Sequence, residues 1–441
     1  MKKRLALAAV LALAAIPVSA NAQSWLSDRR LREGMGIRVG DLELHPALGA
    51  EVGYDTNYSL RAPSEDPDSK YRLKITPAFS VSSLSRQRRL VELDKPAMVM
   101  FDASAYATYH AVFPAGSNSG EDDKTQQRVD GGASLLVRVG YRRPLSGDLG
   151  VDYQHFTERS NLPGDSNAFD RGSIRVGPGI TWRPGGGLFE WRLGYEFQYS
   201  YFVAAQFARL EHVDHAVVTR GRWRFLPRTA LLYDAGYRHI GYTHESGPAS
   251  GDVVRARIGL NGLVLPRLSL LAMGGWTSSF YGEKADSAAR NADSFLAHVE
   301  AKYFVLAPPS LDAAGGETPS AATGLSTVAL GYNRELANSY LNSYVQVDRG
   351  YLRAVYFLGG AFVASLTGGF SHVRFPASPT IAAFSQNRID ARLFAEYRFS
   401  DSFGINATGM FDKNISETLR PPVDDLDYTR WQVYLGARWF M

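Results

Sequence analysis

Polar and apolar side chains alternate along nearly the whole chain, and this period of two constrains the fold more than any other feature. Between Asn387 and Phe399 the odd positions are mainly apolar and the even positions are mainly charged. Between Val217 and Phe225 three arginines share one parity, and apolar side chains dominate the other. A helix would return charged residues to one face every three or four positions, whereas a strand separates its two faces by alternation. The pattern therefore predicts β-strands, each with one apolar face and one strongly polar face.

Eighteen such segments follow one another, and the links between them alternate in length. Short links such as Leu226-Pro227-Arg228 and Leu265-Pro266-Arg267 follow the even-numbered strands, and longer polar links follow the odd-numbered ones. One exception is the Pro-, Ala- and Gly-rich stretch 307–324, which falls where a short link is expected. The predicted strands are centred on Leu48, Phe79, Ala105, Leu135, Val151, Val176, Leu193, Thr219, Tyr233, Ile258, Met273, Val299, Leu330, Val347, Leu366, Leu393, Ala407 and Leu435.

The first residues have the features of a cleaved signal peptide. Three cations at positions 2–4 precede an apolar run over 5–16, and Ala20-Asn21-Ala22 supplies the small residues of a cleavage site. The full chain has 48 Lys and Arg residues, so losing these three leaves 45 against 44 Asp and Glu residues. A nearly neutral mature chain gives no reason to expect a nucleic-acid partner, which would need a basic patch. We expect an exported protein.

An even strand count, alternating turns and loops, and an export signal together predict a transmembrane antiparallel β-barrel in the outer membrane of a Gram-negative bacterium. In hydrocarbon every backbone N–H and C=O must be paired within the protein, and a closed barrel achieves this. The apolar parity then contacts outer-membrane lipid. The expected organisation is a signal peptide over residues 1–22, a periplasmic N-terminal segment over 23–40, and an all-β barrel of about 18 strands over 41–441.

We expect the outer-membrane assembly machinery to recognise the last strand of the barrel. Its outward parity runs from Trp431 to Met441, and Phe440 belongs to the inward parity.

Aromatic residues near the ends of several strands fit interfacial girdles, although aromatic side chains also favour strands in general. These residues are Tyr54, Tyr141, Trp182, Tyr242, Trp276, Tyr303 and Trp439.

The first predicted strand carries the segments Leu44-His45-Pro46-Ala47-Leu48 and Gly53-Tyr54-Asp55-Thr56-Asn57. Together they resemble the opening signature of the outer-membrane β-barrel porin 2 family. The resemblance implies export of an exopolysaccharide or capsular polysaccharide, with a periplasmic polysaccharide-export protein as a partner. The residues themselves have two interpretations: Asp55 and Asn57 either turn the chain into the first loop or bind a ligand, and we favour the structural role.

The inward parity is rich in arginine, which keeps its charge and suits carboxylates and phosphates. Such a wall would favour passage of anionic chains. Alternatively, inward carboxylates such as Asp234 and Glu396 pair with the arginines across strands and leave an ordinary salt-bridged wall. The candidate pathway residues are Arg138, Arg142, Arg175, Arg220, Arg222, Arg224, Arg238, Arg255, Arg257, Arg388, Arg392 and Arg398.

No catalytic, cofactor or metal site is predicted. The chain contains no cysteine, and Gly116-Ser117-Asn118-Ser119-Gly120 has asparagine where a nucleophile elbow needs serine. His212 and His215 are three apart on a strand, so they point to opposite faces, which argues against a shared metal. The acidic runs 121–123 and 424–427 lie on predicted loops, where solvation explains them better than binding of divalent cations.

The sequence therefore predicts an outer-membrane pore that exports an exopolysaccharide. A general or nutrient diffusion porin is the alternative, and a barrel enzyme acting on lipid or peptide is less favoured.

Overall fold

The structure of the chain is a computed structural model. The predicted signal peptide lies outside the described residues, as do residues 23–35 of the predicted N-terminal segment, the segment 116–120, the acidic run 121–123 and residues 424–425 of the run 424–427. The described residues are 36–83, 98–115, 125–141, 143–159, 168–184, 187–282, 291–305, 326–337, 344–358, 361–377, 383–416 and 426–441.

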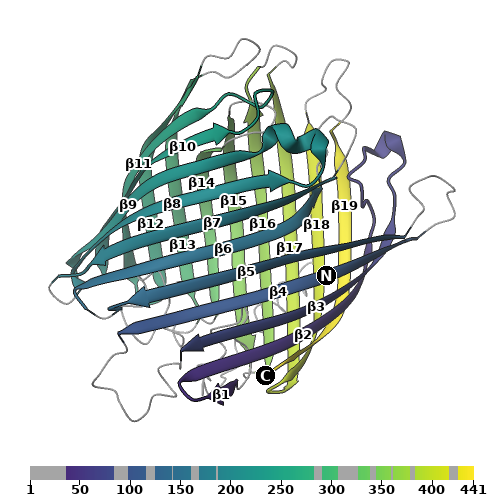
Figure 1. Cartoon of the computed structure of the whole chain (residues 1–441), viewed down its shortest axis with the longest axis horizontal. Coiled ribbons are helices and arrows are strands. Elements are labelled where there is room, and N and C mark those ends of the chain that lie inside the picture. Colours follow the sequence, from purple (N-terminus) through teal and green to yellow (C-terminus); the bar gives the residue numbers. More distant parts are fainter. Residues whose placement is uncertain are drawn as a thin grey trace, which may run out of the picture.

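Eighteen long strands form one closed antiparallel barrel (Figure 1). Each strand pairs with its neighbours in sequence, and β19 closes the barrel by pairing with β2, from Phe440 opposite Ala47 to Gln432 opposite Asp55. The predicted strand number and fold class are confirmed. The strands are β2 (Leu42–Asp55), β3 (Lys70–Ser83), β4 (Val99–Pro114), β5 (Gln126–Val139), β6 (Leu145–Arg159), β7 (Ala168–Trp182), β8 (Phe189–Phe202), β9 (His212–Leu226), β10 (Thr229–Tyr242), β11 (Gly251–Leu265), β12 (Leu268–Tyr281), β13 (Ala292–Phe304), β14 (Thr327–Ala337), β15 (Val345–Leu358), β16 (Phe362–Phe375), β17 (Phe384–Ser400), β18 (Phe403–Ser416) and β19 (Tyr428–Phe440).

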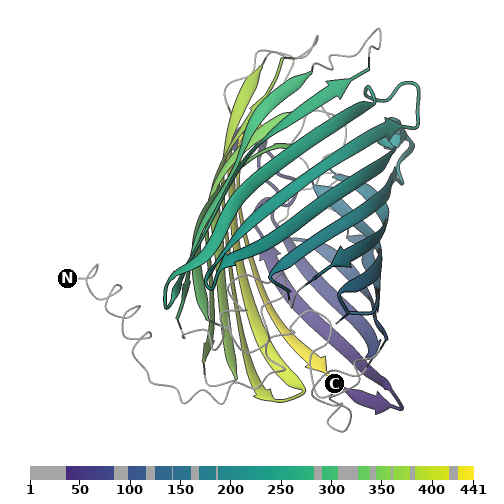
Figure 2. The ribbon, with the colours of Figure 1, turned by 90° about the vertical axis from the view of Figure 1, so that its left-hand side faces the viewer.

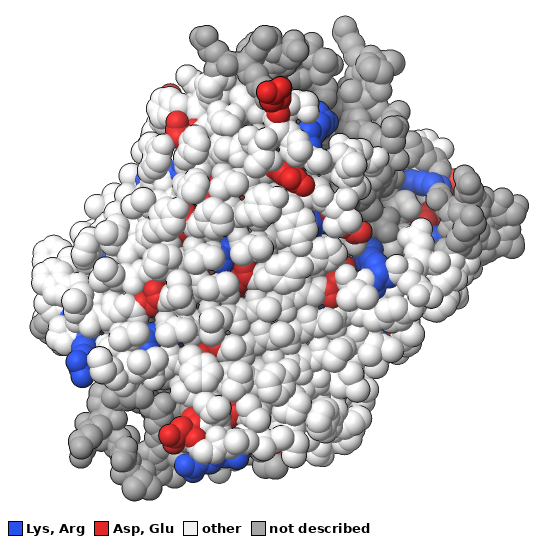
Figure 3. Space-filling view, viewed as in Figure 1, with Lys and Arg blue, Asp and Glu red and all other residues white. Residues whose placement is uncertain are grey.

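The outer face of the barrel is apolar. Side chains of the apolar parity, such as Val52, Ile258 and Leu435, are more than half exposed although they are aliphatic. Figure 3 shows one side of the barrel, and uncharged residues form most of its surface. Exposed aliphatic side chains are stable against hydrocarbon, and closure leaves no strand edge with unpaired backbone groups. The chain is therefore a transmembrane β-barrel of the outer-membrane type.

The two ends of the barrel differ in their connections. The C-terminus lies at one end, beside the short strand β1 (Ile37–Val39), which pairs with residues 42–44 of β2 (Figure 2). We call this end the turn end, because most links there are short, and the opposite end the loop end. Residues 84–98 connect β3 to β4 at the turn end, so the alternation of lengths has this second exception besides 307–324.

Two short 3₁₀ helices, η2 (Pro63–Glu65) and η5 (Ala205–Leu210), lie in links at the loop end. No helix among the described residues is long and apolar enough to cross a membrane.

Six of the seven predicted girdle aromatics are exposed, and Tyr242 is the exception. The outward residues of β10 have odd numbers, as Tyr237 does, so the even-numbered Tyr242 faces inward. Its ring lies 5.5 Å from that of His212, its partner on β9. The assignment of Tyr242 to a girdle was wrong, because nearness to a strand end does not determine parity.

The C-terminal strand has the predicted orientation. Phe440 is buried inside the barrel, and the guanidinium carbon of Arg398 lies 4.2 Å from its ring centroid. Met441 is exposed. The terminal aromatic residue therefore packs against the inner wall, and a methionine takes the outward position.

Candidate functional site

The seam between the first and last barrel strands contains the segment 53–57 that resembles the porin family. Gly53 lies opposite Tyr434 on β19, and a Cβ atom at this position would lie 2.2 Å from the tyrosine ring. Only glycine therefore leaves room for Tyr434, which is almost completely buried. The next residue, Tyr54, faces outward and packs against Tyr71, with ring centroids 5.4 Å apart.

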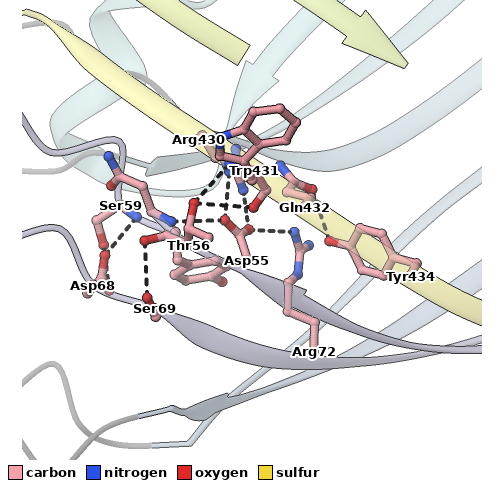
Figure 4. Close-up of polar contacts among 12 residues, drawn as sticks. Asp55, Thr56, Ser59, Asp68, Ser69, Arg72, Arg430, Trp431, Gln432 and Tyr434 are labelled. Atoms are coloured by element: carbon pink, nitrogen blue, oxygen red, sulfur yellow. Dashed lines mark hydrogen bonds and ion pairs between the residues drawn. The ribbon is translucent and has the colours of Figure 1, made fainter. Parts of the chain in front are cut away.

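Asp55 is the centre of an ion cluster at the seam (Figure 4). Its carboxylate accepts hydrogen bonds from Arg430 Nε at 2.9 Å and Nη2 at 2.5 Å. Arg72 Nη1 on β3 donates to the same carboxylate at 3.3 Å, and the side chain of Asp55 is 0% exposed. A buried carboxylate needs such partners, because an unpaired buried charge is very costly. Asp55 thus joins strands β19, β2 and β3.

The following loop is held to β19 and is closed by hydrogen bonds of its own. The Thr56 hydroxyl oxygen accepts a hydrogen bond from the Trp431 N–H at 2.9 Å, and the Thr56 N–H donates to the Trp431 carbonyl at 3.0 Å. Asn57 Nδ2 donates to the Arg61 carbonyl at 2.8 Å, and Arg61 N–H donates back to Asn57 Oδ1 at 2.9 Å. These contacts fix the start of the β2–β3 loop.

Tyr58 in this loop is buried against the inner wall. Its ring lies 5.5 Å from the Arg72 guanidinium carbon, and Arg128 Nη1 on β5 donates to its hydroxyl at 3.3 Å. The loop therefore turns inward at the loop end and reaches from β3 to β5.

The other motif segment, residues 44–48, lies at the turn end of the seam. His45 Nδ1 is 3.1 Å from the main-chain oxygen of Met441, and His45 Nε2 is 3.1 Å from Glu43 Oε1. The Met441 N–H donates to the Pro46 carbonyl at 3.0 Å. Both motif segments therefore hold the seam closed, and the structural role that the sequence favoured for Asp55 and Asn57 is confirmed.

The predicted pathway arginines lie on the inner face, apart from Arg142, which is outside the described residues. Their placement follows from strand parity, since the opposite parity of each strand carries the exposed apolar side chains. They are spread over several strands rather than gathered at one point: Arg138 (β5), Arg175 (β7), Arg220, Arg222 and Arg224 (β9), Arg238 (β10), Arg255 and Arg257 (β11), and Arg388, Arg392 and Arg398 (β17).

Several inward carboxylates lie between two cations each. Asp234 Oδ1 is 3.6 Å from Arg255 Nε and 3.2 Å from Arg257 Nη2. Glu190 Oε2 is 2.9 Å from Arg183 Nε and 3.3 Å from Arg222 Nη2. Pairing across strands, one of the two alternatives from the sequence, is therefore present. Around Asp234 one carboxylate serves two arginines, so this group has a net charge of +1.

The same arrangement recurs around the barrel. Glu396 lies between Arg398 Nε at 2.7 Å and Arg438 Nη1 at 2.9 Å. Glu300 on β13 lies between Lys302 Nζ at 3.2 Å and Arg353 Nη2 at 3.9 Å. The groups around Asp234 and Glu300 each contain two cations and one carboxylate, so they place positive charge on separate parts of the inner wall.

The remaining predicted arginines have varied surroundings. Arg388 forms two hydrogen bonds to Asp412, and Arg238 Nη2 is 3.9 Å from Glu196 Oε2. Arg175 donates to Gln198 Oε1 from two nitrogens, and the Arg138 guanidinium stacks on the ring of Tyr141. Arg392 has no ion pair within the described part of the chain.

Two cavities open from the inner wall and share Arg257. The first has a volume of about 500 Å³, and its polar lining includes Arg238 and Arg255. The second has a volume of about 580 Å³ and is lined in part by Arg349, Tyr351 and Arg353 of β15. We did not predict these three residues from the sequence. A signal was present, because they occupy one parity of the strand Val345–Leu358.

The structure places His212 and His215 on opposite faces, as predicted. His212 is buried on the inner face, and outward-facing His215 is 2.6 Å from the Tyr195 hydroxyl. Among the described residues, no group of three or more His, Asp or Glu side chains could hold a metal ion.

No family model and no curated protein matches this chain. Among solved structures it is similar to the outer membrane protein OpdK from Pseudomonas aeruginosa, with 12% identity over 90% of this chain and 99% of that chain, at a TM-score of 0.47. A BenF-like porin from Pseudomonas fluorescens Pf-5 has 10% identity over 91% and 100%, at 0.49. OccAB2 from Acinetobacter baumannii has 8% identity over 90% and 97%, at 0.47. Because these TM-scores are below 0.5, the similarities establish neither the fold nor the function of this chain. The fold is established by the strand pairing.

Proposed function

We propose that this protein is an outer-membrane channel through which small organic anions diffuse. The observation that supports this function best is the set of inward carboxylates that lie between two cations each, as Asp234 does between Arg255 and Arg257. A barrel of 18 strands is wide enough to enclose an aqueous channel. A lining with excess positive charge raises the local concentration of anions and lowers that of cations.

Arginine suits this function because its charge persists at any physiological pH and its planar fork binds carboxylates with two hydrogen bonds. The carboxylates beside the arginines hold them in place across strands, so that little conformational entropy is lost when a solute binds. Arg257 is well placed for solute contacts, since it lines both cavities.

The size of the cavities supports a small solute. Volumes of about 500 and 580 Å³ are within the range of pockets that hold metabolite-sized ligands. The ring of Tyr351 and the guanidinium groups of Arg349 and Arg353 line the larger cavity, so a carboxylate attached to a compact carbon skeleton would find both charge and an apolar surface.

Export of an exopolysaccharide remains a prediction from the resemblance of the opening motif. The motif residues Gly53, Asp55 and Asn57 are engaged at the seam, so their presence does not favour a polymer over a small solute. Gene deletion separates the two functions. Under our proposal surface polysaccharide is unchanged, whereas its loss with accumulation in the periplasm would favour export.

The channel function is tested by reversal potentials of the purified barrel in planar bilayers under gradients of potassium chloride and potassium acetate. We expect anion preference in the unaltered protein. The variant R255Q/R257Q converts the group around Asp234, of charge +1, into a lone carboxylate. Two unit charges close together in water interact by about 1 kcal/mol, which corresponds to a factor of about five. The anion-to-cation permeability ratio of the variant should therefore fall about fivefold or more.

The control R143Q removes an exposed arginine from the β5–β6 turn and should leave the ratio unchanged. A cation preference in the unaltered protein, or an unchanged ratio in R255Q/R257Q, would refute the proposal.

A further inference from the structure

Two neighbouring turns at the turn end share both sequence and geometry. Leu226-Pro227-Arg228 joins β9 to β10, and Leu265-Pro266-Arg267 joins β11 to β12. Because β10 pairs with β11, the two turns are adjacent on the rim, two strand spacings or roughly 10 Å apart. Neither turn lines the two cavities of the inner wall, so the proposed solute contacts do not explain their common sequence.

A β-bulge immediately before each turn changes which side chains face outward. The register shifts between Thr229 and Leu231 in the first hairpin, and between Leu263 and Leu265 in the second. An extra residue in one strand interrupts strict alternation, so two successive side chains can face the same side. Accordingly, the consecutive pairs Phe225–Leu226 and Val264–Leu265 are all exposed, with Leu226 at 53% and Leu265 at 57%.

The backbone of each arginine is fixed by the next strand. The Leu263 N–H donates to the Arg228 carbonyl at 2.9 Å, and the Phe304 N–H donates to the Arg267 carbonyl at 2.8 Å. Both arginine side chains are exposed, and neither has an ion pair within the described residues. Arg267 donates one hydrogen bond to the Val305 carbonyl at 3.3 Å, which leaves its other N–H groups for a ligand. The rim thus presents two exposed arginines at fixed backbone positions beside four exposed apolar side chains.

We infer that these two turns bind the headgroups of anionic phospholipids in the periplasmic leaflet, since outer-membrane barrels have their short turns on the periplasmic side. The apolar pairs continue the lipid-facing surface of β9 and β11 to its end, where they would lie among acyl chains. The arginines follow directly after them, at the level at which phosphates occur. A guanidinium group donates two parallel hydrogen bonds to a phosphate, and an arginine extends along an apolar surface while its charged end stays in the polar region. A soluble anion would use the arginines but not the exposed leucines, so a lipid fits the whole surface better.

The inference is tested with the full-length barrel in detergent, by measuring binding of a fluorescent phosphatidylglycerol and, separately, of a fluorescent phosphatidylcholine. We expect the unaltered protein to prefer phosphatidylglycerol. Each arginine near an anionic membrane surface contributes about a fivefold affinity, so R228Q/R267Q should lose about 25-fold in phosphatidylglycerol affinity and become nearly indifferent to the headgroup. The serine variant L226S/L265S should weaken binding of both lipids.

Three controls distinguish the outcomes. R228K/R267K keeps both charges and should keep most of the preference, and R209Q removes an exposed cation at the loop end and should have no effect. Glycerol 3-phosphate, which has the phosphate without acyl chains, should not displace the lipid. Folding of each variant is checked by heat-modifiable migration in gel electrophoresis. No headgroup preference in the unaltered protein, the same preference in R228Q/R267Q, or displacement by glycerol 3-phosphate at equal concentration would overturn the inference.

Discussion

Replacing Asp55 by asparagine tests whether the seam depends on its buried ion cluster. Asp55 is fully buried and accepts hydrogen bonds from Arg430, Arg72 and the Asn57 N–H. The variant D55N removes the negative charge and leaves two guanidinium groups without their counter-ion. Removing one partner of a buried ion pair costs about 3–5 kcal/mol in free energy of unfolding. A loss of this size lowers the folding equilibrium constant by two to three orders of magnitude or more, a large part of the stability of a typical domain.

The assay is equilibrium unfolding in urea of the barrel folded into phospholipid vesicles, followed by tryptophan fluorescence. The control D390N removes a carboxylate that also receives two hydrogen bonds from one arginine, Arg349 at 2.7 and 2.8 Å. The side chain of Asp390 is 28% exposed, so water can replace those bonds and we expect a loss of about 1 kcal/mol or less.

A double-mutant cycle of D55N and R430Q then isolates the direct interaction. Because the two side chains are in contact, their effects should be non-additive by about 0.5–3 kcal/mol. The reasoning is refuted if D55N loses no more stability than D390N, or if D55N and R430Q are additive.

Two further predictions concern the same seam. The variant G53A places a methyl group 2.2 Å from the ring of Tyr434, which is too buried to move aside, so unfolding free energy should fall by about 1–3 kcal/mol. The matched variant G49A has its nearest neighbour at 3.8 Å and should change stability by about 0.5 kcal/mol or less, and equal urea midpoints for the two variants would contradict the clash. The variant F440A removes a buried ring beside Arg398 and should cost about 3–5 kcal/mol, whereas M441A removes an exposed side chain and should cost far less; similar losses in thermal melts would show that Phe440 is not packed as described.

The strands themselves could be predicted from the sequence, and the reason is that their signal is local. In a barrel each strand has one face toward lipid and one toward the interior, so every strand shows its orientation in its own alternation of side chains. All eighteen predicted centres, from Leu48 to Leu435, lie in strands of the barrel. The same alternation placed Phe440 inward, Met441 outward, and His212 and His215 on opposite faces.

The composition of the inner wall could be predicted only in part. Parity identified most of its arginines, but a sequence does not say which carboxylate lies beside which arginine. That depends on register: Asp234 lies opposite Arg257, and a shift of one residue would turn either side chain to the other face. The net charge of +1 on the group of Asp234, Arg255 and Arg257 is therefore a property of the assembled sheet. The parity of β15 would have placed Arg349 and Arg353 on the inner face, but only the barrel brings them to the same cavity as Arg257.

Period-two alternation determined the fold class, the strand number and the two faces of each strand, because each of these depends on residues within about fifteen positions of one another. The tertiary structure alone decided the closure of the barrel, the function of its opening motif and the exceptions to alternation. Asp55 and Arg430 are 375 residues apart in the chain and meet only when β19 pairs with β2. The bulges beside Leu226 and Leu265, and the inward position of Tyr242, likewise follow from pairing between strands, which no single strand encodes by itself.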